Sequence, residues 1–277
     1  FLFTELFFIS LVNKSQKPAI FRTIAIIRAL FFLFRFVTWL NSVLVTYLKL
    51  ACQLNNLESS LVASAFYIAY LVMAAPSTWV LKVFGFKKGM AIGLLIMAVG
   101  AVIFIPAALT RTYMFFLAGL FVQGAGLSIL QTASNPYVVV LGPVESAAKR
   151  ISIMGICNKF AGAIAPIALG SVAMKNVDQL KITLTTLSPA GKIPLLNELA
   201  SRVIVPYICI MAALVVLAVL IYFSTLPEIN TEKEDESTAL ANTNKTSIFQ
   251  FPHLLLGVLA LFLYVGAEVL SGILLSV

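Results

Sequence analysis

The stretch that decides the fold is Tyr113–Leu141, which reads YMFFLAGLFVQGAGLSILQTASNPYVVVL. It contains no charged residue, so as a helix it is long enough to cross the ~30 Å hydrocarbon core of a bilayer. In its second half Ser128, Gln131, Thr132 and Asn135 recur at spacings that place them on one helix face. Polar side chains at bilayer depth are costly unless they face protein or water. Amides and hydroxyls without charge favour a neutral polyhydroxylated ligand, such as a sugar.

Composition indicates the class of protein independently of any motif. Hydrophobic residues make up 61% of the chain and charged residues 11%, with a mean hydropathy of +1.02. A soluble domain has roughly 25% charged residues, so an all-α polytopic membrane protein is expected. The net charge of +8 fits basic loops beside a bilayer, and no nucleic-acid partner is needed to explain it. The three cysteines are far apart without a CxxC pair, so we expect neither metal ligands nor a disulfide framework. We also expect no cofactor.

Seven segments are long and apolar enough to span a membrane. They are residues 22–48, 59–81, 88–109, 113–141, 151–174, 203–226 and 251–276. Between the fifth and sixth, residues 176–201 read as a mixed polar loop outside the membrane. Between the sixth and seventh lies a charged, solvated linker. Six spans, a linker and one further span resemble one transporter half followed by the start of another.

These features divide the chain into four parts. Residues 1–20 are an N-terminal segment of uncertain origin: either interfacial or foreign sequence is favoured over a signal remnant. Residues 21–226 form a six-helix half, residues 227–250 a cytoplasmic linker, and residues 251–277 the first helix of a second half. Because the chain lacks an initiator Met and stops as its last span emerges, we expect a fragment of a longer protein.

Basic residues predict an N-terminus in the cytoplasm, under the positive-inside rule. With that orientation the inside carries Lys14, Lys17, Arg22, Lys82, Lys87, Lys88, Lys149, Arg150, Lys233 and Lys245. The outside carries Lys49, Arg111, Lys175, Lys181, Lys192 and Arg202. Arg28, Arg35 and Lys159 lie within predicted spans.

Short motifs in four of the spans, the first, third, fourth and seventh, and in their connections carry a family resemblance. They are FVTWLNS at 36–42, GFKKG at 85–89, IPAA at 105–108, LQTASNPY at 130–137, LGP at 141–143, PHL at 252–254 and YVGAE at 264–268. In this order they resemble the L-fucose permease branch of the major facilitator superfamily, closest to its bacterial glucose/galactose transporter subgroup. The similarity runs from about Phe31 to the C-terminal end of the chain.

The resemblance implies a twelve-helix major facilitator fold with a sugar site between its two six-helix halves. This chain would supply the N-terminal half plus transmembrane helix seven. The implied function is uptake of a neutral hexose of glucose, galactose or fucose type by alternating access, as ion-coupled symport with H⁺ or Na⁺. The implied location is the bacterial inner membrane, with the lipid bilayer as surroundings and no obligate protein partner.

Six residues form the predicted substrate-binding set, because amides and an ammonium can hydrogen-bond sugar oxygens. They are Asn41, Ser42, Gln131, Asn135, Asn158 and Lys159. Each amide has an alternative role as a helix–helix hydrogen bond. For Asn135, which precedes Pro136, distortion of the helix is at least as favoured as ligand contact.

Two positions depart from the fucose permease pattern. That branch has an aspartate at the position of Ser42 and a glutamate at that of Gln131, which are its expected proton and sugar sites. Neither residue here can titrate. Glu268 is the one carboxylate inside a predicted span, so it is the candidate coupling residue, with pairing to Lys159 as an option. Nothing in the sequence explains Arg35, which stands where the family usually has a small residue.

The connection around residues 82–88 is a candidate gating loop. Lys82, Lys87 and Lys88 could bind acidic groups or helix C-termini and hold one conformational state. Their alternative role is to set topology alone. Tyr67 and Tyr70, with Ser60 and Ser64, are candidates to line the transport path, although packing is the commoner role of such tyrosines.

Three other readings compete with a transporter. A nonfunctional truncated remnant of such a transporter is the main alternative, and a complete seven-helix sensor is a weaker one. A membrane-embedded enzyme is disfavoured, because the sequence has no HExxH or GxSxG motif and no paired intramembrane aspartates. We therefore expect no catalytic residues.

Overall fold

The structure, a computed structural model, describes residues 17–140, 144–173, 177–224, Leu226, Glu228 and 251–275. Most of the predicted N-terminal segment and, apart from Glu228, the predicted linker lie outside these residues. All regular structure in the described part of the chain is helical, which confirms the all-α prediction. Two compact units are distinguished, Phe1–Glu228 and Ile229–Val277, and each is described by itself.

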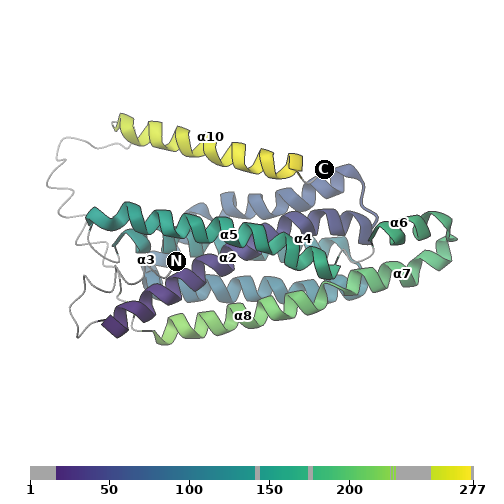
Figure 1. Ribbon diagram of the computed structural model, residues 1–277, viewed down its shortest axis with the longest axis horizontal. Helices are drawn as coiled ribbons and strands as arrows, with labels where there is room; N and C mark the ends of the chain where they lie inside the picture. The colour runs from purple at the N-terminus through teal and green to yellow at the C-terminus, as the bar shows by residue number, and fades with distance from the viewer. Residues whose placement is uncertain are drawn as a thin grey trace. The chain divides into compact units, whose positions relative to one another are not determined.

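The first unit is a helical bundle (Figure 1). Its long helices are α2 (Lys17–Ala51), α3 (Asn56–Thr110), α4 (Tyr113–Val140), α5 (Ala147–Ala173) and α8 (Ile204–Phe223). A short 3-10 turn, η1 (Val144–Ser146), precedes α5. By length and composition, the described residues of this unit form helices that can cross a membrane in each segment where a span was predicted.

The long α3 is two helices joined at a sharp break. Gly85 has φ +78° and ψ 172°, a backbone conformation that only glycine adopts without strain. The break separates residues 56–84 from residues 86–110, which confirms the two spans predicted on either side of it. Asn55 and Glu58 form a capping box at the start of α3, each side chain accepting a hydrogen bond from the other's backbone N–H.

The second arm of α3 packs against α4 with almost no side-chain spacer. A Cβ on Gly126 would lie 2.5 Å from the Gly93 carbonyl oxygen, and a Cβ on Gly100 would lie 2.9 Å from that of Gly119. Each helix thus offers two glycines seven residues apart, and the four form two facing pairs. Backbone contact of this kind is typical of membrane helices that associate through small residues.

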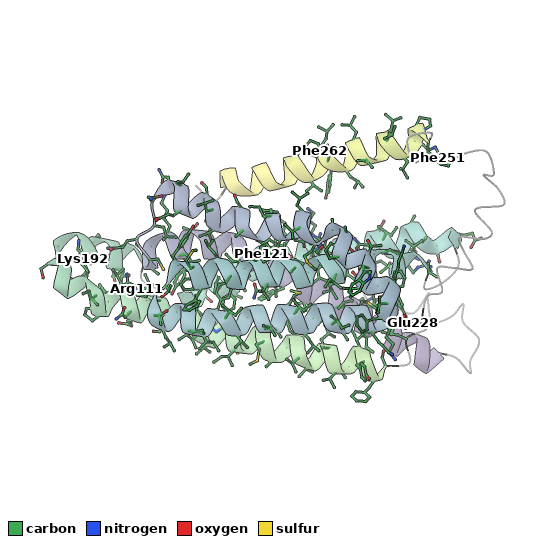
Figure 2. The ribbon with its side chains drawn as sticks, turned by 180° about the vertical axis from the view of Figure 1, so that it is seen from behind. Arg111, Phe121, Lys192, Glu228, Phe251 and Phe262 are labelled. Carbon is green, nitrogen blue, oxygen red and sulfur yellow. The ribbon has the colours of Figure 1, made fainter. Side chains whose placement is uncertain are left out.

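The connection between α5 and α8 differs from the prediction of a polar loop. It forms α6 (Val177–Thr186) and α7 (Pro189–Ser201). Figure 2 shows Lys192 of α7 at the end of the bundle opposite Glu228, whose carboxylate lies against Gly85. Pro189 does not interrupt a helix here, because it occupies the first position of α7, where a proline has no hydrogen bond to lose. We call the two ends of the bundle the Gly85 end and the α7 end.

The second unit contains α10 (Pro252–Leu275), which coincides with the seventh predicted span. Its described apolar part, Pro252–Ala267, is shorter than the helices of the bundle that can span a bilayer. The side chain of Glu268 is outside the described residues. Its predicted pairing with Lys159 therefore stays a prediction.

Candidate functional site

The polar stripe of α4 runs from a packed end to an open end. Ser128 is buried, and its hydroxyl lies 3.1 Å from that of Ser77 on α3. The Thr132 hydroxyl donates to the Ser128 carbonyl at 2.8 Å. Gln131 is half-buried and Asn135 is exposed. These two are the more open members of the stripe, whereas the two hydroxyls already hydrogen-bond within the bundle.

The proline in this stripe leaves α4 continuous. The helix extends from Tyr113 to Val140 with Pro136 inside it. A proline ring removes the hydrogen bond to the carbonyl four residues earlier, which here belongs to Thr132. The stripe therefore adds a backbone acceptor beside Gln131 and Asn135.

On α2, Asn41 is buried with an unsatisfied side chain. It is 7% exposed, and neither its amide nitrogen nor its amide oxygen has a hydrogen-bond partner among the described residues. The Thr38 hydroxyl, by contrast, donates to the Phe34 carbonyl at 2.8 Å. The Ser42 side chain lies outside the described residues. An amide left unpaired in the interior costs stability unless a ligand or water satisfies it.

On α5, two predicted residues lie beside an open strip of the helix. Asn158 is half-buried with a carbonyl oxygen that has no described partner, and Lys159 is exposed. A Cβ on Gly155 would meet nothing within 4 Å, whereas one on Gly162 would lie 2.9 Å from Nε1 of Trp39. Gly162 thus seats Trp39 of α2 against α5, while Gly155 faces open space.

The tyrosines proposed for the transport path form an aromatic cluster on the first arm of α3. Phe66 meets Tyr67 and Tyr70 edge-on, with ring centroids 5.8 and 5.7 Å away. Ser60 and Ser64 donate to backbone carbonyls of their own helix at 2.9 and 2.8 Å. The two serine hydroxyls are therefore used within α3, and the two tyrosine rings pack around Phe66 of the same arm.

One buried amide was missed by the sequence analysis. Gln123 of α4 is fully buried, and both polar atoms of its side chain lack a described partner. A Cβ on Gly100 would lie 2.6 Å from the Gln123 Cγ, so this side chain packs on α3. The available signal was a glutamine in an otherwise apolar half of α4, outside the polar stripe.

At the Gly85 end, one lysine of the predicted gating loop contacts the end of α8 and Glu228. Lys87 Nζ donates to the Ser224 carbonyl at the end of α8 at 2.5 Å. The Lys87 backbone N–H donates to Oε1 of Glu228 at 3.3 Å. A Cβ on Gly85 would clash with that same carboxylate oxygen. Lys82 and Lys88 are exposed.

The α4–α5 connection at this end is held by an arginine. Arg150 Nε donates to the Val138 carbonyl at 2.8 Å, and a second guanidinium nitrogen donates to the Val139 carbonyl at 2.6 Å. A third bond, at 2.5 Å, joins the guanidinium to the Ser146 hydroxyl. A cation at a helix C-terminus satisfies carbonyls that the helix leaves unpaired.

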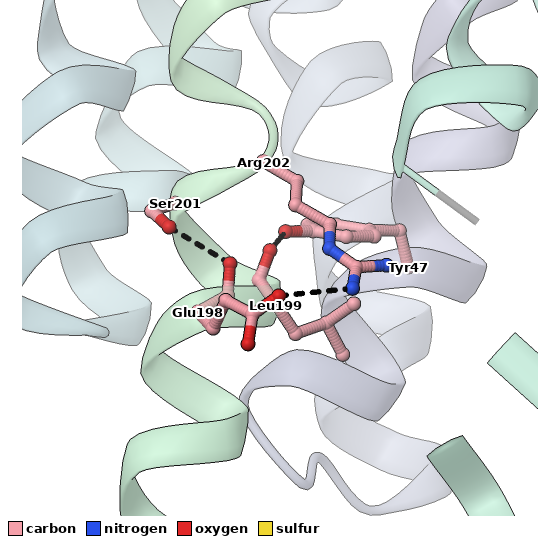
Figure 3. A network of polar contacts seen from close by, with 5 residues as sticks. All are labelled: Tyr47, Glu198, Leu199, Ser201 and Arg202. Carbon is pink, nitrogen blue, oxygen red and sulfur yellow. Dashed lines mark hydrogen bonds and ion pairs between the residues drawn. The ribbon is translucent and has the colours of Figure 1, made fainter. Parts of the chain in front are cut away.

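The α7 end has its own polar contacts, shown in Figure 3. The Tyr47 hydroxyl of α2 donates to the Leu199 carbonyl of α7. Arg202 and Glu198 form an ion pair at 3.2 Å. Arg111, which Figure 2 shows at the opposite end of the bundle from Glu228, donates to the Ala51 carbonyl at 3.1 Å. The Tyr47 and Arg111 bonds join α7 and the α3–α4 turn to α2, whereas the ion pair lies within the end of α7.

Comparison with known proteins agrees with this arrangement. The model of the Major Facilitator Superfamily matches residues 26–276. The glucose/galactose transporter of Brucella abortus is 37% identical over 243 residues, covering 88% of this chain and 55% of that protein. The L-fucose-proton symporter of Escherichia coli is 33% identical over 258 residues, covering 92% and 59%.

Solved structures show the same fold. A variant of the fucose:proton symporter of E. coli matches with a TM-score of 0.65 and 32% identity, over 76% of this chain and 50% of that one. A second structure, a superfamily transporter in the outward conformation, matches with a TM-score of 0.67 and 31% identity, over 80% and 56%. The chain spans little more than half the length of the curated relatives it matches. It is an all-α polytopic membrane protein, and it belongs to the Major Facilitator Superfamily.

Proposed function

We propose that this chain is the N-terminal half and seventh helix of a secondary transporter that takes up a neutral hexose by alternating access. The carrying observation is the set of uncharged amides on α2, α4 and α5, two of which retain unpaired buried atoms. The relatives named above are a glucose/galactose transporter and a fucose-proton symporter. Residues 21–226 would form the half, 227–250 a linker, and 251–277 the first helix of the second half.

In this proposal the bound sugar supplies hydrogen bonds that buried amide atoms of this half lack when no sugar is present. Asn41 and Asn158 each carry a buried amide atom with no described partner, and Gln131 and Asn135 lie on the open part of the α4 stripe. An amide both donates and accepts, so it can bridge two neighbouring hydroxyls of a hexose. Lys159 and Ser42 would complete the set. A neutral ligand is then recognised by hydrogen bonds alone.

The same proposal places the Gly85 end in the cytoplasm of a bacterium and the protein in its inner membrane. Lys82, Lys87, Lys88, Lys149 and Arg150 all belong to this end, and the positive-inside rule assigns such clusters to the cytoplasmic side. Lys87 would act as the gate, because its bond to the Ser224 carbonyl ties α3 to the end of α8 and would have to break when these helices separate.

Ion coupling would use a residue other than the two neutral positions on α2 and α4. Ser42 and Gln131 cannot bind a proton, which leaves Glu268 as the carboxylate within the predicted spans. In proton-driven transport Glu268→Gln should abolish accumulation against a gradient but spare sugar exchange, because exchange needs no net protonation. Intact accumulation would remove Glu268 from the mechanism and favour Na⁺ or an acid elsewhere.

Counterflow of labelled hexoses tests the proposal directly. The chain and a version joined to a complete second half would be reconstituted in liposomes loaded with unlabelled D-glucose, D-galactose or L-fucose. Transient accumulation of one labelled hexose, prevented by Asn41→Leu, is the expected result for the two-half protein. Absence of counterflow for every hexose in a folded two-half protein would overturn the proposal. Counterflow that requires the second half would identify this chain by itself as inactive.

A further inference from the structure

One face of α2 is aromatic and is turned away from the buried Asn41. Phe32, Phe36 and Trp39 recur at spacings of four and three residues, which places them on one side of the helix. The rings of Phe32 and Phe36 are stacked, with centroids 6.0 Å apart and an interplanar angle of 27°. All three side chains are half-buried, and no described side chain between residues 30 and 45 is exposed. Another helix therefore covers this aromatic face.

The covering helix is α5, and Trp39 makes the contact. Nε1 and Cδ1 of its indole would lie 2.9 and 3.1 Å from a Cβ on Gly162, so the ring rests directly on the α5 backbone. Trp39 is at the middle of the span Ile26–Ala51, and Gly162 is near the middle of the span Ala147–Val172. The contact is therefore close to the midplane of a bilayer.

The two helices run in the same direction across the bundle. Helix α2 ends beside α7, where the Tyr47 hydroxyl donates to the Leu199 carbonyl. Helix α5 begins at the Gly85 end, where Arg150 bonds the last carbonyls of α4, and it ends on the side of α6 and α7 (Figure 1). Two turns before the contact, the two helices therefore place Phe32 and Gly155 at about the same depth.

Space opens beside α5 at that depth. A Cβ on Gly155 would meet nothing within 4 Å. Asn158 follows on the same side of α5, and its buried side-chain oxygen has no described hydrogen-bond partner. A sugar ring uses both kinds of surface, because its hydroxyls need polar partners and its C–H groups pack on the electron-rich faces of aromatic rings.

We propose that the aromatic face of α2 and the strip of α5 around Gly155 and Asn158 form a stacking subsite for the pyranose ring of the transported hexose. The C–H face of the sugar packs on the rings of Phe32 and Phe36, beside Trp39. The bare backbone of Gly155 leaves room for the sugar, and the Asn158 oxygen accepts a hydrogen bond from a hydroxyl. This inference rests on the proposed hexose transport and deepens it, because it adds selection for a closed sugar ring.

Tryptophan emission can report on this subsite, because the chain has two tryptophans. Trp79 of α3 is 64% exposed, so Trp79→Phe should fold and leave Trp39 as the single emitter. D-Galactose, D-glucose and L-fucose would each be titrated into this purified chain in detergent. We expect a saturable change in Trp39 emission with at least one hexose. Galactitol, an open-chain polyol with the hydroxyl configuration of galactose, should give none.

Gly155→Leu, made in the Trp79→Phe chain, fills the space that the sugar would occupy. It should leave the unfolding midpoint nearly unchanged, since a Cβ there meets nothing, and should weaken hexose binding at least about tenfold. Gly170→Leu is the matched control on the same helix, because a Cβ there also meets nothing within 4 Å. It lies eight residues beyond Gly162 and should bind hexose like the parent. Phe36→Leu removes one ring and should weaken binding about two- to tenfold.

Three results would each overturn the subsite. They are the absence of a saturable Trp39 response to all three hexoses, an equal response to galactitol, and unchanged hexose binding in Gly155→Leu. The last would mean that the space beside Gly155 holds only lipid or detergent.

The subsite and the transport proposal fail in different experiments. Counterflow in the two-half protein that Gly155→Leu leaves intact would overturn the subsite and leave hexose transport standing. Saturable hexose binding that Gly155→Leu abolishes, in a protein whose two-half version shows no counterflow, would do the reverse.

Discussion

The α3–α4 contact and the α2–α5 region of the same bundle differ in how closely their helices pack and in how much space is left open beside them. Between α3 and α4, glycines bring backbones together and the hydroxyls of Ser77 and Ser128 bond each other. Around α2 and α5, Asn41 and Asn158 retain unpaired amide atoms, and Gly155 faces open space. The first region serves as scaffold because its backbones are in contact, although the buried amide of Gln123 also lacks a described partner there. The second combines unpaired amide atoms with open space, which is what a binding surface requires before its ligand arrives.

The largest expected effect comes from filling the scaffold contact. Gly126→Ala would place a methyl group 2.5 Å from the Gly93 carbonyl oxygen, so the two backbones must separate. We expect a loss of about 1–3 kcal/mol, at the upper end because the obstacle is backbone. Thermal unfolding in detergent measures it. Gly155→Ala is the matched control and should be neutral or slightly stabilising, since nothing lies within 4 Å. Similar losses at both positions would remove the distinction between the regions.

The next effect concerns ligand binding on the open part of α4. Gln131→Ala should weaken hexose binding by about 1–3 kcal/mol, because the sugar hydroxyls that it meets would be left unpaired. Binding titration of the two-half protein measures the change. Thr132→Val is the control, as the Thr132 hydroxyl already bonds the Ser128 carbonyl. An alanine-to-valine change at Ala133 would not serve, since that residue is fully buried and would be overpacked. Equal losses in Gln131→Ala and Thr132→Val would make the stripe a packing surface.

A smaller effect is expected at the Gly85 end. Lys87→Gln shortens the side chain and removes the charge that bonds the Ser224 carbonyl, which should lower the free energy of unfolding by about 0.5–1.5 kcal/mol. Lys88→Gln changes the same charge one residue along at an exposed side chain, so it should have little effect. Chemical denaturation compares the two variants. If Lys88→Gln destabilises as much, the lysines act only through their total charge.

The smallest effect is a labelling rate, and it also tests topology. Lys88→Cys and Thr110→Cys, both at exposed positions, would be compared in intact cells with an impermeant thiol reagent. Only position 110 should react if the Gly85 end is cytoplasmic. Labelling of position 88 would contradict this topology, because it would place the Gly85 end outside the cell.

The native Cys52 supplies an internal check on that experiment. Burial raises the pKa of its thiol, and Arg111 partly opposes the rise. Because the thiolate is the reacting form and less of it exists at neutral pH when the pKa is raised, Cys52 should react slowly and faster as pH increases. Arg111→Met should slow it further. A rate independent of pH would contradict the raised pKa.

Local sequence determined where the helices are. Apolar runs determine every predicted span. The break in α3 falls at Gly85, which is flanked by basic residues and lies between two apolar runs. Both features depend on short stretches of chain. The family resemblance likewise came from short motifs, among them LQTASNPY. Helices α6 and α7 were missed because Pro189 and Pro194 resemble breakers, although the first sits at a helix start.

Only the tertiary structure decided which faces are covered. Helical spacing groups Ser128 with Gln131 and Asn135, yet Ser77 on another helix takes Ser128 out of the open stripe. The same holds for Gly155 and Gly162, which are seven residues apart and share a face of α5. Trp39 packs on Gly162, whereas nothing lies within 4 Å of a Cβ at Gly155. Periodicity assigns residues to a face, since it follows from 3.6 residues per turn. What packs on that face depends on a partner distant in the chain, which no local pattern specifies.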